Sequence, residues 1–112
     1  MKDYLLLFRG GLDFSTASPE ELQQAMMKWK IWTEELIKKG TYSGGNRLTE
    51  NGTVLKGTKK QITDGPFTES KEIIGGYISI KVADKEEAVE MAKDCPIFHY
   101  DGIVEVREVA KM

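Results

Sequence analysis

The spacing of apolar residues changes along the chain between two periods, and the change predicts where strands and helices lie. Residues 4–9 are almost continuously apolar, which is typical of a strand buried on both faces. Apolar and polar residues alternate over 73–82 and again over 103–109, as in strands that bury one face. Residues 41–48 predict a further strand, in which two adjacent glycines indicate a bulge or a close backbone approach.

A long helix is predicted after the first strand. Ser18 and Glu21 have the spacing of a capping box, and Pro19 fits the first helical position. Apolar residues then recur every three or four positions until about Lys39, and Gly40 is a typical residue at a helix end. The stripe expected to face the core consists of Leu22, Ala25, Met26, Trp29, Trp32, Thr33 and Leu36.

A second helix and a hairpin complete the predicted elements. Asp84 caps the helix, the apolar spacing continues to Cys95, and Pro96 ends it. Residues 49–63 predict a hairpin, with turn signals at residues 51–52 and at Gly57. This order predicts an α+β fold of the ferredoxin-like βαββαβ type with an inserted hairpin. Its antiparallel sheet would carry two helices on one face.

Composition and charge are those of an ordinary globular protein. The 112 residues suit a single domain spanning 1–112, 30% of them are charged, and the net charge is −2. A nucleic-acid partner is not expected, because such domains usually carry a basic excess. The apolar start is too short for an export signal, no stretch is long enough to cross a membrane, and a single cysteine suits a reducing compartment. We therefore expect a cytoplasmic protein that has no membrane partner.

The sequence does not contain motifs for metals or cofactors. One histidine and one cysteine without paired spacing cannot build a tetrahedral metal site. Cys95 falls on the apolar stripe of the second helix, where a thiol behaves as a small hydrophobic group. The glycine pairs at 10–11 and 75–76 lack the spacing of phosphate-binding loops. We expect neither a metal nor a cofactor.

The stretch DGPFTESKE, residues 64–72, has two interpretations. In the first, which the residue types favour, Asp64, Gly65 and Pro66 form a turn that leads into the next strand. In the second, the Asp64 carboxylate lies beside an aromatic wall from Phe67, and these partly dry surroundings suit a general base. We expect a turn with a site built on it, which directs Asp64 and Phe67 toward a cleft between two subunits.

His99 is a second candidate for acid–base chemistry, because it is the only histidine of the chain. It lies between Phe98 and Tyr100, in the connection from a helix to a strand, where a residue that fills the edge of the core is equally typical. A catalytic role and a structural role both stay open for His99. We expect it to be dispensable for folding.

The sheet face without helices is the most informative predicted surface. Four apolar residues of two strands are expected under the helices: Ile78, Ile80, Val104 and Val106. The residues that alternate with them then project from the opposite face: Tyr77, Ser79, Lys81, Glu105 and Arg107. Arg107 suits an anionic substrate group, and Tyr77 suits a proton donor. Glu105 is a candidate substrate contact or simply the salt-bridge partner of Arg107. An ion-pair network at a subunit interface explains these charges equally well.

Several segments resemble one protein family. DGPFTESKE followed by IIGGYISIKV resembles the DGPFAETKE signature of the YCII-related proteins, with differences at Thr68 and Ser70. The closing VEVREV and both predicted helices fall in matching places, so the similarity spans nearly the whole chain. The resemblance implies a ferredoxin-like subunit that pairs face to face with a second copy as a dimeric α/β barrel. It also implies a ligand cleft near the pairing sheets.

The resemblance does not supply a reaction. The wider superfamily includes muconolactone-isomerase-like enzymes and small monooxygenases, whereas the DGPF branch is largely of unknown function, and a shared fold does not transfer a reaction. The His and Asp pair of the YCII proteins proper, with its His soon after the first strand, has no counterpart here, because GGLDFSTASPE contains no histidine. Asp64 matches the signature aspartate.

Two functions follow from the sequence. In the first, a homodimer binds a small, anionic metabolite in a cleft near the dimer interface, with acid–base chemistry at Asp64. In the second, the chain is a non-catalytic binding, sensing or accessory protein whose sheet face serves only for dimerisation or partner docking. The scarcity of acid–base groups favours the second function, and the polar cluster on the sheet face favours the first. The sequence therefore leaves open whether the protein is an enzyme.

Overall fold

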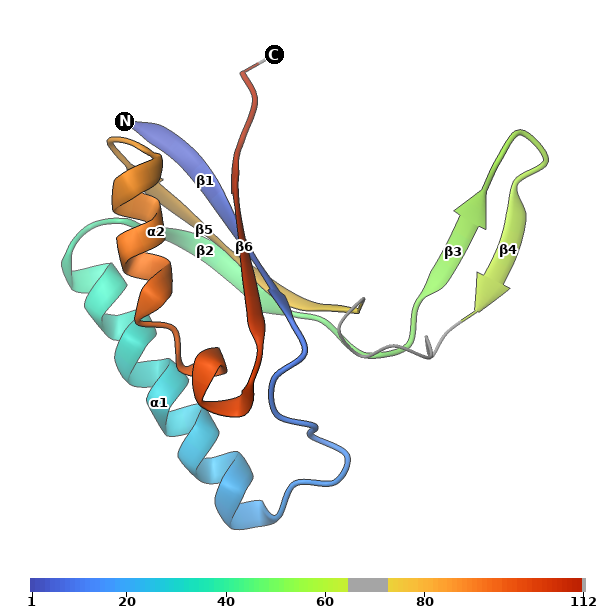
Figure 1. Ribbon diagram of the computed structural model, residues 1–112, viewed down its shortest axis with the longest axis horizontal. Helices are drawn as coiled ribbons and strands as arrows, with labels where there is room; N and C mark the ends of the chain where they lie inside the picture. Colours follow the sequence, from blue (N-terminus) through green and yellow to red (C-terminus); the bar gives the residue numbers. More distant parts are fainter. Residues whose placement is uncertain (65–72, 112) are drawn as a thin grey trace.

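The computed structural model describes residues 1–64 and 73–111, which form a four-stranded sheet, two helices and a separate hairpin (Figure 1). The elements along the chain are β1 (Lys2–Arg9), α1 (Pro19–Lys38), β2 (Tyr42–Arg47), β3 (Thr53–Lys56), β4 (Gln61–Asp64), β5 (Ile74–Val82), α2 (Lys85–Lys93), the 3-10 helix η2 (Pro96–Tyr100) and β6 (Ile103–Glu108). Within the described residues, neither helix combines the length and the apolar character that a membrane crossing requires.

The sheet has the strand order of the ferredoxin-like fold. β1 pairs antiparallel with β5 and β6, and β2 pairs antiparallel with β5, which gives the order β2-β5-β1-β6. The register places Leu7 opposite Tyr77 on one side and opposite Glu105 on the other. Because successive strand residues point to opposite faces, Leu6 and Leu7 belong to different faces of the sheet. The predicted α+β class is confirmed.

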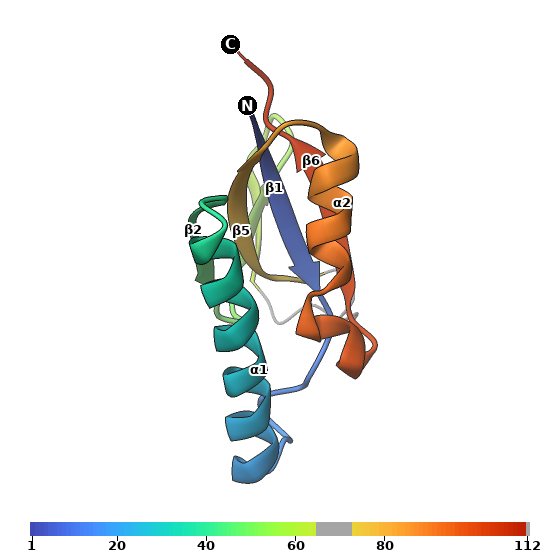
Figure 2. The same ribbon diagram turned by 90° about the vertical axis from the view of Figure 1, so that its left-hand side faces the viewer.

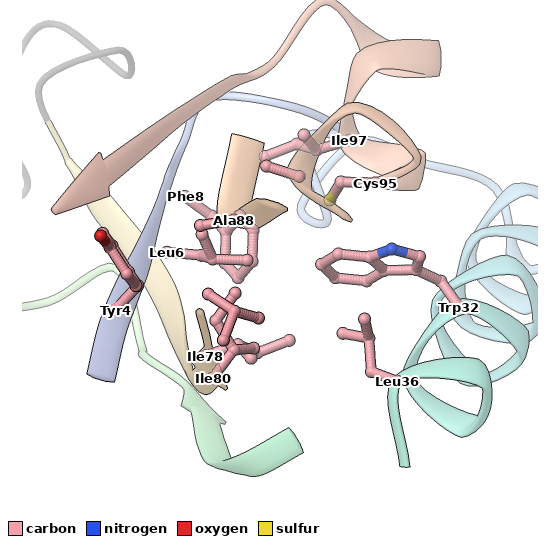
Figure 3. Packing of buried hydrophobic residues seen from close by; sticks show 12 residues of the cluster. Tyr4, Leu6, Phe8, Trp32, Leu36, Ile78, Ile80, Ala88, Cys95 and Ile97 are labelled. Atoms are coloured by element: carbon pink, nitrogen blue, oxygen red, sulfur yellow. The ribbon is translucent and has the colours of Figure 1, made fainter. Parts of the chain in front are cut away.

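Both helices cover the same face of the sheet (Figure 2). Trp32 and Leu36 of α1 point toward Leu6, Phe8 and the β5 residues of the core (Figure 3). α2 contributes Ala88 and Ala92, whose small side chains let this helix lie close to the strands. Val104 and Val106 pack against the same cluster, as predicted. One core therefore lies between the sheet and the two helices.

Local signals in the sequence explain where the helices begin. The hydroxyl of Ser18 accepts a hydrogen bond from the backbone N–H of Glu21, and the Glu21 carboxylate accepts one from the N–H of Ser18. This is the predicted capping box. Asp84 caps α2 in the same way, since its carboxylate accepts the N–H of Glu87 at 2.9 Å. The indole N–H of Trp32 donates to the carbonyl of Met91 at 3.3 Å and ties α1 to the end of α2.

The β3–β4 hairpin, residues 53–64, stands away from the sheet on the side opposite the helices (Figure 1). We call it the arm. Leu55 pairs directly with Ile62, and these two side chains are 62% and 67% exposed. A two-stranded hairpin has little stability of its own in water. The arm therefore exposes two paired apolar side chains among polar and charged ones.

The structure differs from the predicted elements in a few places. Met26 was expected in the core but is 63% exposed, because its side of α1 borders a cavity instead of packing against the core. The turn of the arm lies at residues 57–60, with left-handed backbone at Gly57 and Lys60, whereas the expected turn at residues 51–52 only precedes β3. The second helix ends at Lys93 rather than at Cys95, and the chain continues as η2.

Candidate functional site

A cavity of about 570 Å³ lies on the helix-covered side of the sheet. Its boundaries are one side of α1, the loop of residues 10–17 between β1 and α1, and the sheet edge formed by β2 and β5. This volume is in the usual range of pockets that hold small organic ligands. We call it the helix-side cavity.

Aromatic side chains form much of the wall of this cavity. Among the described residues, the aromatic residues of the lining are Phe8, Phe14, Trp29, Tyr42, Tyr77 and Tyr100, of which Tyr77 has its side chain on the opposite face of the sheet. The rings of Phe8 and Trp29 meet edge to face, with centroids 4.9 Å apart and an interplanar angle of 88°. Trp32 packs behind Trp29 at 5.6 Å, in the core and outside the lining. Such edge-to-face packing holds Trp29 in place as a rigid wall.

Two glycines leave part of the sheet side of the cavity without side chains. Gly45 of β2 and Gly76 of β5 both line it, and a Cβ built on Gly45 would lie 2.5 Å from the carbonyl oxygen of Tyr77. A larger residue at Gly45 would therefore push β2 away from β5. The close approach that the glycine-rich segment 41–48 predicted from the sequence is found at this position.

The loop of residues 10–17 closes one side of the cavity and has a defined conformation. Gly10 and Gly11 both have positive φ angles, which turn the chain sharply after β1. The Asp13 carboxylate then accepts hydrogen bonds from the hydroxyl and the backbone N–H of Ser15, at 2.6 Å and 2.9 Å. These hydrogen bonds lower the pKa of Asp13 below its ordinary value. The Asp13 turn presents Phe14 to the cavity.

Phe14 contacts the one arginine of the cavity lining. The Cζ atom of Arg47 lies 3.9 Å from the centre of the Phe14 ring, a cation–π distance. Arg47 is on β2 and Phe14 is in the loop, so this contact joins the sheet edge to the loop across the cavity. Lys30 and Glu34, on α1, also line the cavity and lie 4.0 Å apart as an ion pair.

The opposite face of the sheet carries the residues predicted to project there. Glu105 forms ion pairs with Arg9 and with Arg107, the latter at 3.0 Å. Tyr77 accepts a hydrogen bond from Asn46 at 3.0 Å and lies in one cross-strand row with Leu7 and Glu105. We call this surface the bare face. The structure thus brings three predicted site residues, Tyr77, Glu105 and Arg107, onto one surface.

Asp64 and His99 lie elsewhere. Asp64 ends the arm, is exposed, and accepts a hydrogen bond from the Thr53 hydroxyl at 2.8 Å. His99 is exposed in η2 and is not part of the cavity lining, although the adjacent Tyr100 is. Phe67, which was predicted beside Asp64, lies outside the described residues. Within one chain, the two predicted acid–base residues are therefore not brought together with the bare-face cluster.

Cys95 and metal ligands play no part in this site. Cys95 is buried in the core, and burial raises the pKa of its thiol to about 12. A thiol with such a pKa stays protonated and unreactive near neutral pH. Over residues 1–64 and 73–111, no three acidic, histidine or cysteine side chains gather as metal ligands would.

Comparison with known proteins identifies the family. Residues 15–112 match the family model of the YCII-related domain, which is most of the chain. The chain belongs to the YCII-related family. No curated protein matches it. The resemblance inferred from DGPFTESKE is thereby confirmed, and in this YCII-related chain the helix-side cavity, the bare face and the arm are three distinct surfaces.

The sequence did not reveal the helix-side cavity. Arg47 and Phe14 are far apart in the chain, and each taken alone is an ordinary residue next to glycines or a turn. One signal was present: the predicted apolar stripe of α1 includes Met26 and Trp29, and it is wider than the surface that the core buries. A helix with more apolar surface than its sheet can cover leaves space for something else.

Proposed function

We propose that this YCII-related protein binds a small organic molecule in the helix-side cavity and pairs with a second copy through the bare face. The cavity volume of about 570 Å³, enclosed mainly by apolar and aromatic side chains, is the observation that carries the binding proposal. Cavities of this size and character, with a few polar groups at the rim, are the common form of small-molecule sites.

Binding without catalysis is the simpler form of this function. Among the described residues, the titratable residues of the lining are Lys30, Glu34, Tyr42, Arg47, Tyr77 and Tyr100, whereas His99 and Asp64 are not part of it. Lys30 and Glu34 are engaged with each other. A site that holds a ligand by shape and aromatic contact needs no proton-transfer pair.

Two methionines on α1 provide a matched test of the cavity. Met26 lines it and is 63% exposed, whereas its neighbour Met27 is 57% exposed and does not line it. Replacing Met26 by Trp narrows the cavity, and replacing Met27 by Trp adds the same group to the outer surface of the same helix. Either replacement should leave stability within about 0.5 kcal/mol, as is usual for exposed positions.

The experiment is mass spectrometry of small molecules that co-purify with the protein from its native host. Wild type and Met27→Trp are expected to carry the same molecule in near-stoichiometric amount, and Met26→Trp is expected to have lost it. The proposal is wrong if wild type carries no small molecule, or if Met26→Trp retains the same molecule at the same level.

The proposal that two copies pair rests on the apolar residues at the centre of the bare face. Leu5 and Leu7 lie half-buried at the centre of this face, and no helix covers them. An uncovered sheet face in so small a domain usually meets another surface. A second copy is the occupant we propose, because the bare face carries both charge signs in Arg9, Glu105 and Arg107 and can complement itself across a two-fold axis.

The arm supports the same pairing. It stands on the bare-face side of the sheet, so a second copy packed on that face would also lie against the arm (Figure 1). Leu55 and Ile62 would then gain the cover that their own subunit does not give them. The same arrangement would give the dimeric α/β barrel that the family resemblance implies.

Acid–base chemistry at Asp64 is the second candidate function, and it requires the dimer. Among the described residues, Asp64 lies on the arm and outside the helix-side cavity, so the cleft we propose for it is formed with a partner subunit. The Thr53 hydroxyl bonds one carboxylate oxygen, Oδ1, and so fixes the orientation of the group. Asp64→Asn keeps the size of the side chain and removes its charge. Turnover is measured with the co-purified molecule as substrate. If Asp64 is catalytic, Asp64→Asn should lower turnover at least tenfold, and unchanged turnover excludes this role.

A further inference from the structure

We propose that the ligand of the helix-side cavity is a flat aromatic carboxylate, whose ring lies between the aromatic walls and whose carboxylate pairs with Arg47. This inference rests on the ligand binding proposed above, and it names the chemical class that the cavity recognises.

The walls favour a flat ring over a flexible chain. Trp29 and Phe8 are held edge to face, and Tyr42 and Phe14 line other parts of the same space. Rigid aromatic walls offer flat faces and edges for stacking, and aromatic pairs contribute beyond the area they bury. An aliphatic chain would bury apolar surface against these walls but would not gain the additional energy of aromatic pairing.

The charges of the lining favour an anion. Among the described residues, the ionic side chains of the lining are Lys30, Glu34 and Arg47. Lys30 and Glu34 carry opposite charges, which cancel in the net charge of the lining. Arg47 is left as the net positive charge, so an anionic group on the ligand would be attracted and a cationic one repelled.

The position of Arg47 favours a planar anion such as a carboxylate. Its guanidinium lies over the Phe14 ring, with Cζ 3.9 Å from the ring centre. When an aromatic ring stacks on a guanidinium, it covers one face of the group and leaves the N–H groups free to donate in the guanidinium plane. Two of them can donate in parallel to the two oxygens of a carboxylate. The Phe14 contact also holds the side chain before the ligand arrives.

Two pairs of probes separate shape from charge. 2-Naphthoate and 2-naphthylmethanol share a flat bicyclic ring and differ in the anionic group, whereas 2-naphthoate and decanoate share the carboxylate and differ in shape. Binding of each probe is measured by isothermal titration calorimetry to wild type, Arg47→Gln, Arg47→Lys and Lys59→Gln. Lys59 is a charge-matched control, because it lies in the turn of the arm and outside the cavity.

Wild type is expected to bind 2-naphthoate at least tenfold more tightly than either of the other probes. Arg47→Gln is expected to weaken 2-naphthoate at least tenfold and to change 2-naphthylmethanol less than twofold. Arg47→Lys should restore only part of the loss, because an ammonium group cannot make the paired contact. Lys59→Gln should bind all three probes as wild type does.

The outcomes distinguish the ligand class from the binding function. If 2-naphthylmethanol binds as tightly as 2-naphthoate, or Arg47→Gln weakens both equally, the carboxylate assignment is wrong while the cavity remains a ligand site. If decanoate binds as tightly as 2-naphthoate, the aromatic assignment is wrong. If no probe binds, and no molecule co-purifies with the protein, both proposals fail.

Discussion

The guanidinium of Arg47 on β2 lies over the ring of Phe14 in the loop before α1, with Cζ 3.9 Å from the ring centre. This contact joins the edge strand β2 to the loop that precedes α1. It fixes the Arg47 side chain at the helix-side cavity and the loop of residues 10–17 beside it. In the proposed binding mode, recognition of the anion therefore depends on Phe14, a residue that would not itself bond to the anion.

Phe14→Ala tests that dependence. Removing the ring leaves Arg47 charged but no longer held, so affinity for 2-naphthoate should fall by about threefold to tenfold, as loss of a cation–π contact of about 0.5–1 kcal/mol and some aromatic contact would produce. Unfolding in urea should change by less than about 1 kcal/mol, because the loop lies at the surface. Phe98→Ala removes a half-exposed ring outside the cavity and should leave 2-naphthoate binding unchanged. Equal effects of the two variants would contradict the positioning role of Phe14.

Adjacent leucines of β1 should have different effects on stability. Leu6 is fully buried under the helices, so Leu6→Ala should lower the free energy of unfolding by about 2–5 kcal/mol. Leu7 points to the bare face and is only half-buried in one subunit, so at protein concentrations too low for pairing Leu7→Ala should cost much less. Urea unfolding followed by circular dichroism measures both. A loss at Leu7 as large as that at Leu6 would place Leu7 in the core instead.

Leu7→Lys tests the pairing of two copies. A lysine in the row between Tyr77 and Glu105 places an extra charge at the centre of the proposed interface, so the dimer should dissociate at least tenfold more readily. Sedimentation velocity at micromolar concentration should show a dimer for wild type and a monomer for Leu7→Lys. Met27→Lys, on the outer side of α1, should stay dimeric. A monomeric wild type would overturn the pairing.

The buried thiol of Cys95 should make the free energy of unfolding fall at alkaline pH. Burial raises the pKa of its thiol to about 12, so the folded chain keeps a proton that the unfolded chain releases near its ordinary pKa of about 8.5. The contribution of the protonated Cys95 thiol to the free energy of unfolding is fully present below about pH 8.5. It is lost as pH rises toward about 12, because unfolding then releases a proton. In Cys95→Ala, the fall in unfolding free energy between pH 8 and pH 10 should be smaller than in wild type. An identical fall in both proteins would contradict this assignment.

Local patterns predicted most of the fold. The capping box at Ser18 and Glu21, the alternation in β5 and the proline after α2 each appear in the structure where the sequence placed them. These features depend on residues close together in the chain, so short-range spacing is enough to find them. The burial of Val104 and Val106 followed from the same alternation.

The candidate sites were harder to predict, because they depend on contacts between distant residues. Alternation alone placed Tyr77, Glu105 and Arg107 on one face, but it could not show that Glu105 also pairs with Arg9 of β1. The cation–π contact of Arg47 requires a loop conformation set by two positive-φ glycines and the Asp13 turn. No spacing rule indicates that such a loop returns to β2.

Binding in the helix-side cavity is tested most directly by the two indole N–H signals in a ¹H–¹⁵N spectrum of the protein. Trp29 lines the cavity, while Trp32 lies behind it and donates its N–H to the Met91 carbonyl at 3.3 Å. During titration with 2-naphthoate, the Trp29 signal, assigned by its absence in Trp29→Phe, should shift several times more than the Trp32 signal. Two unmoved signals, or a larger shift at Trp32, would contradict ligand binding in this cavity.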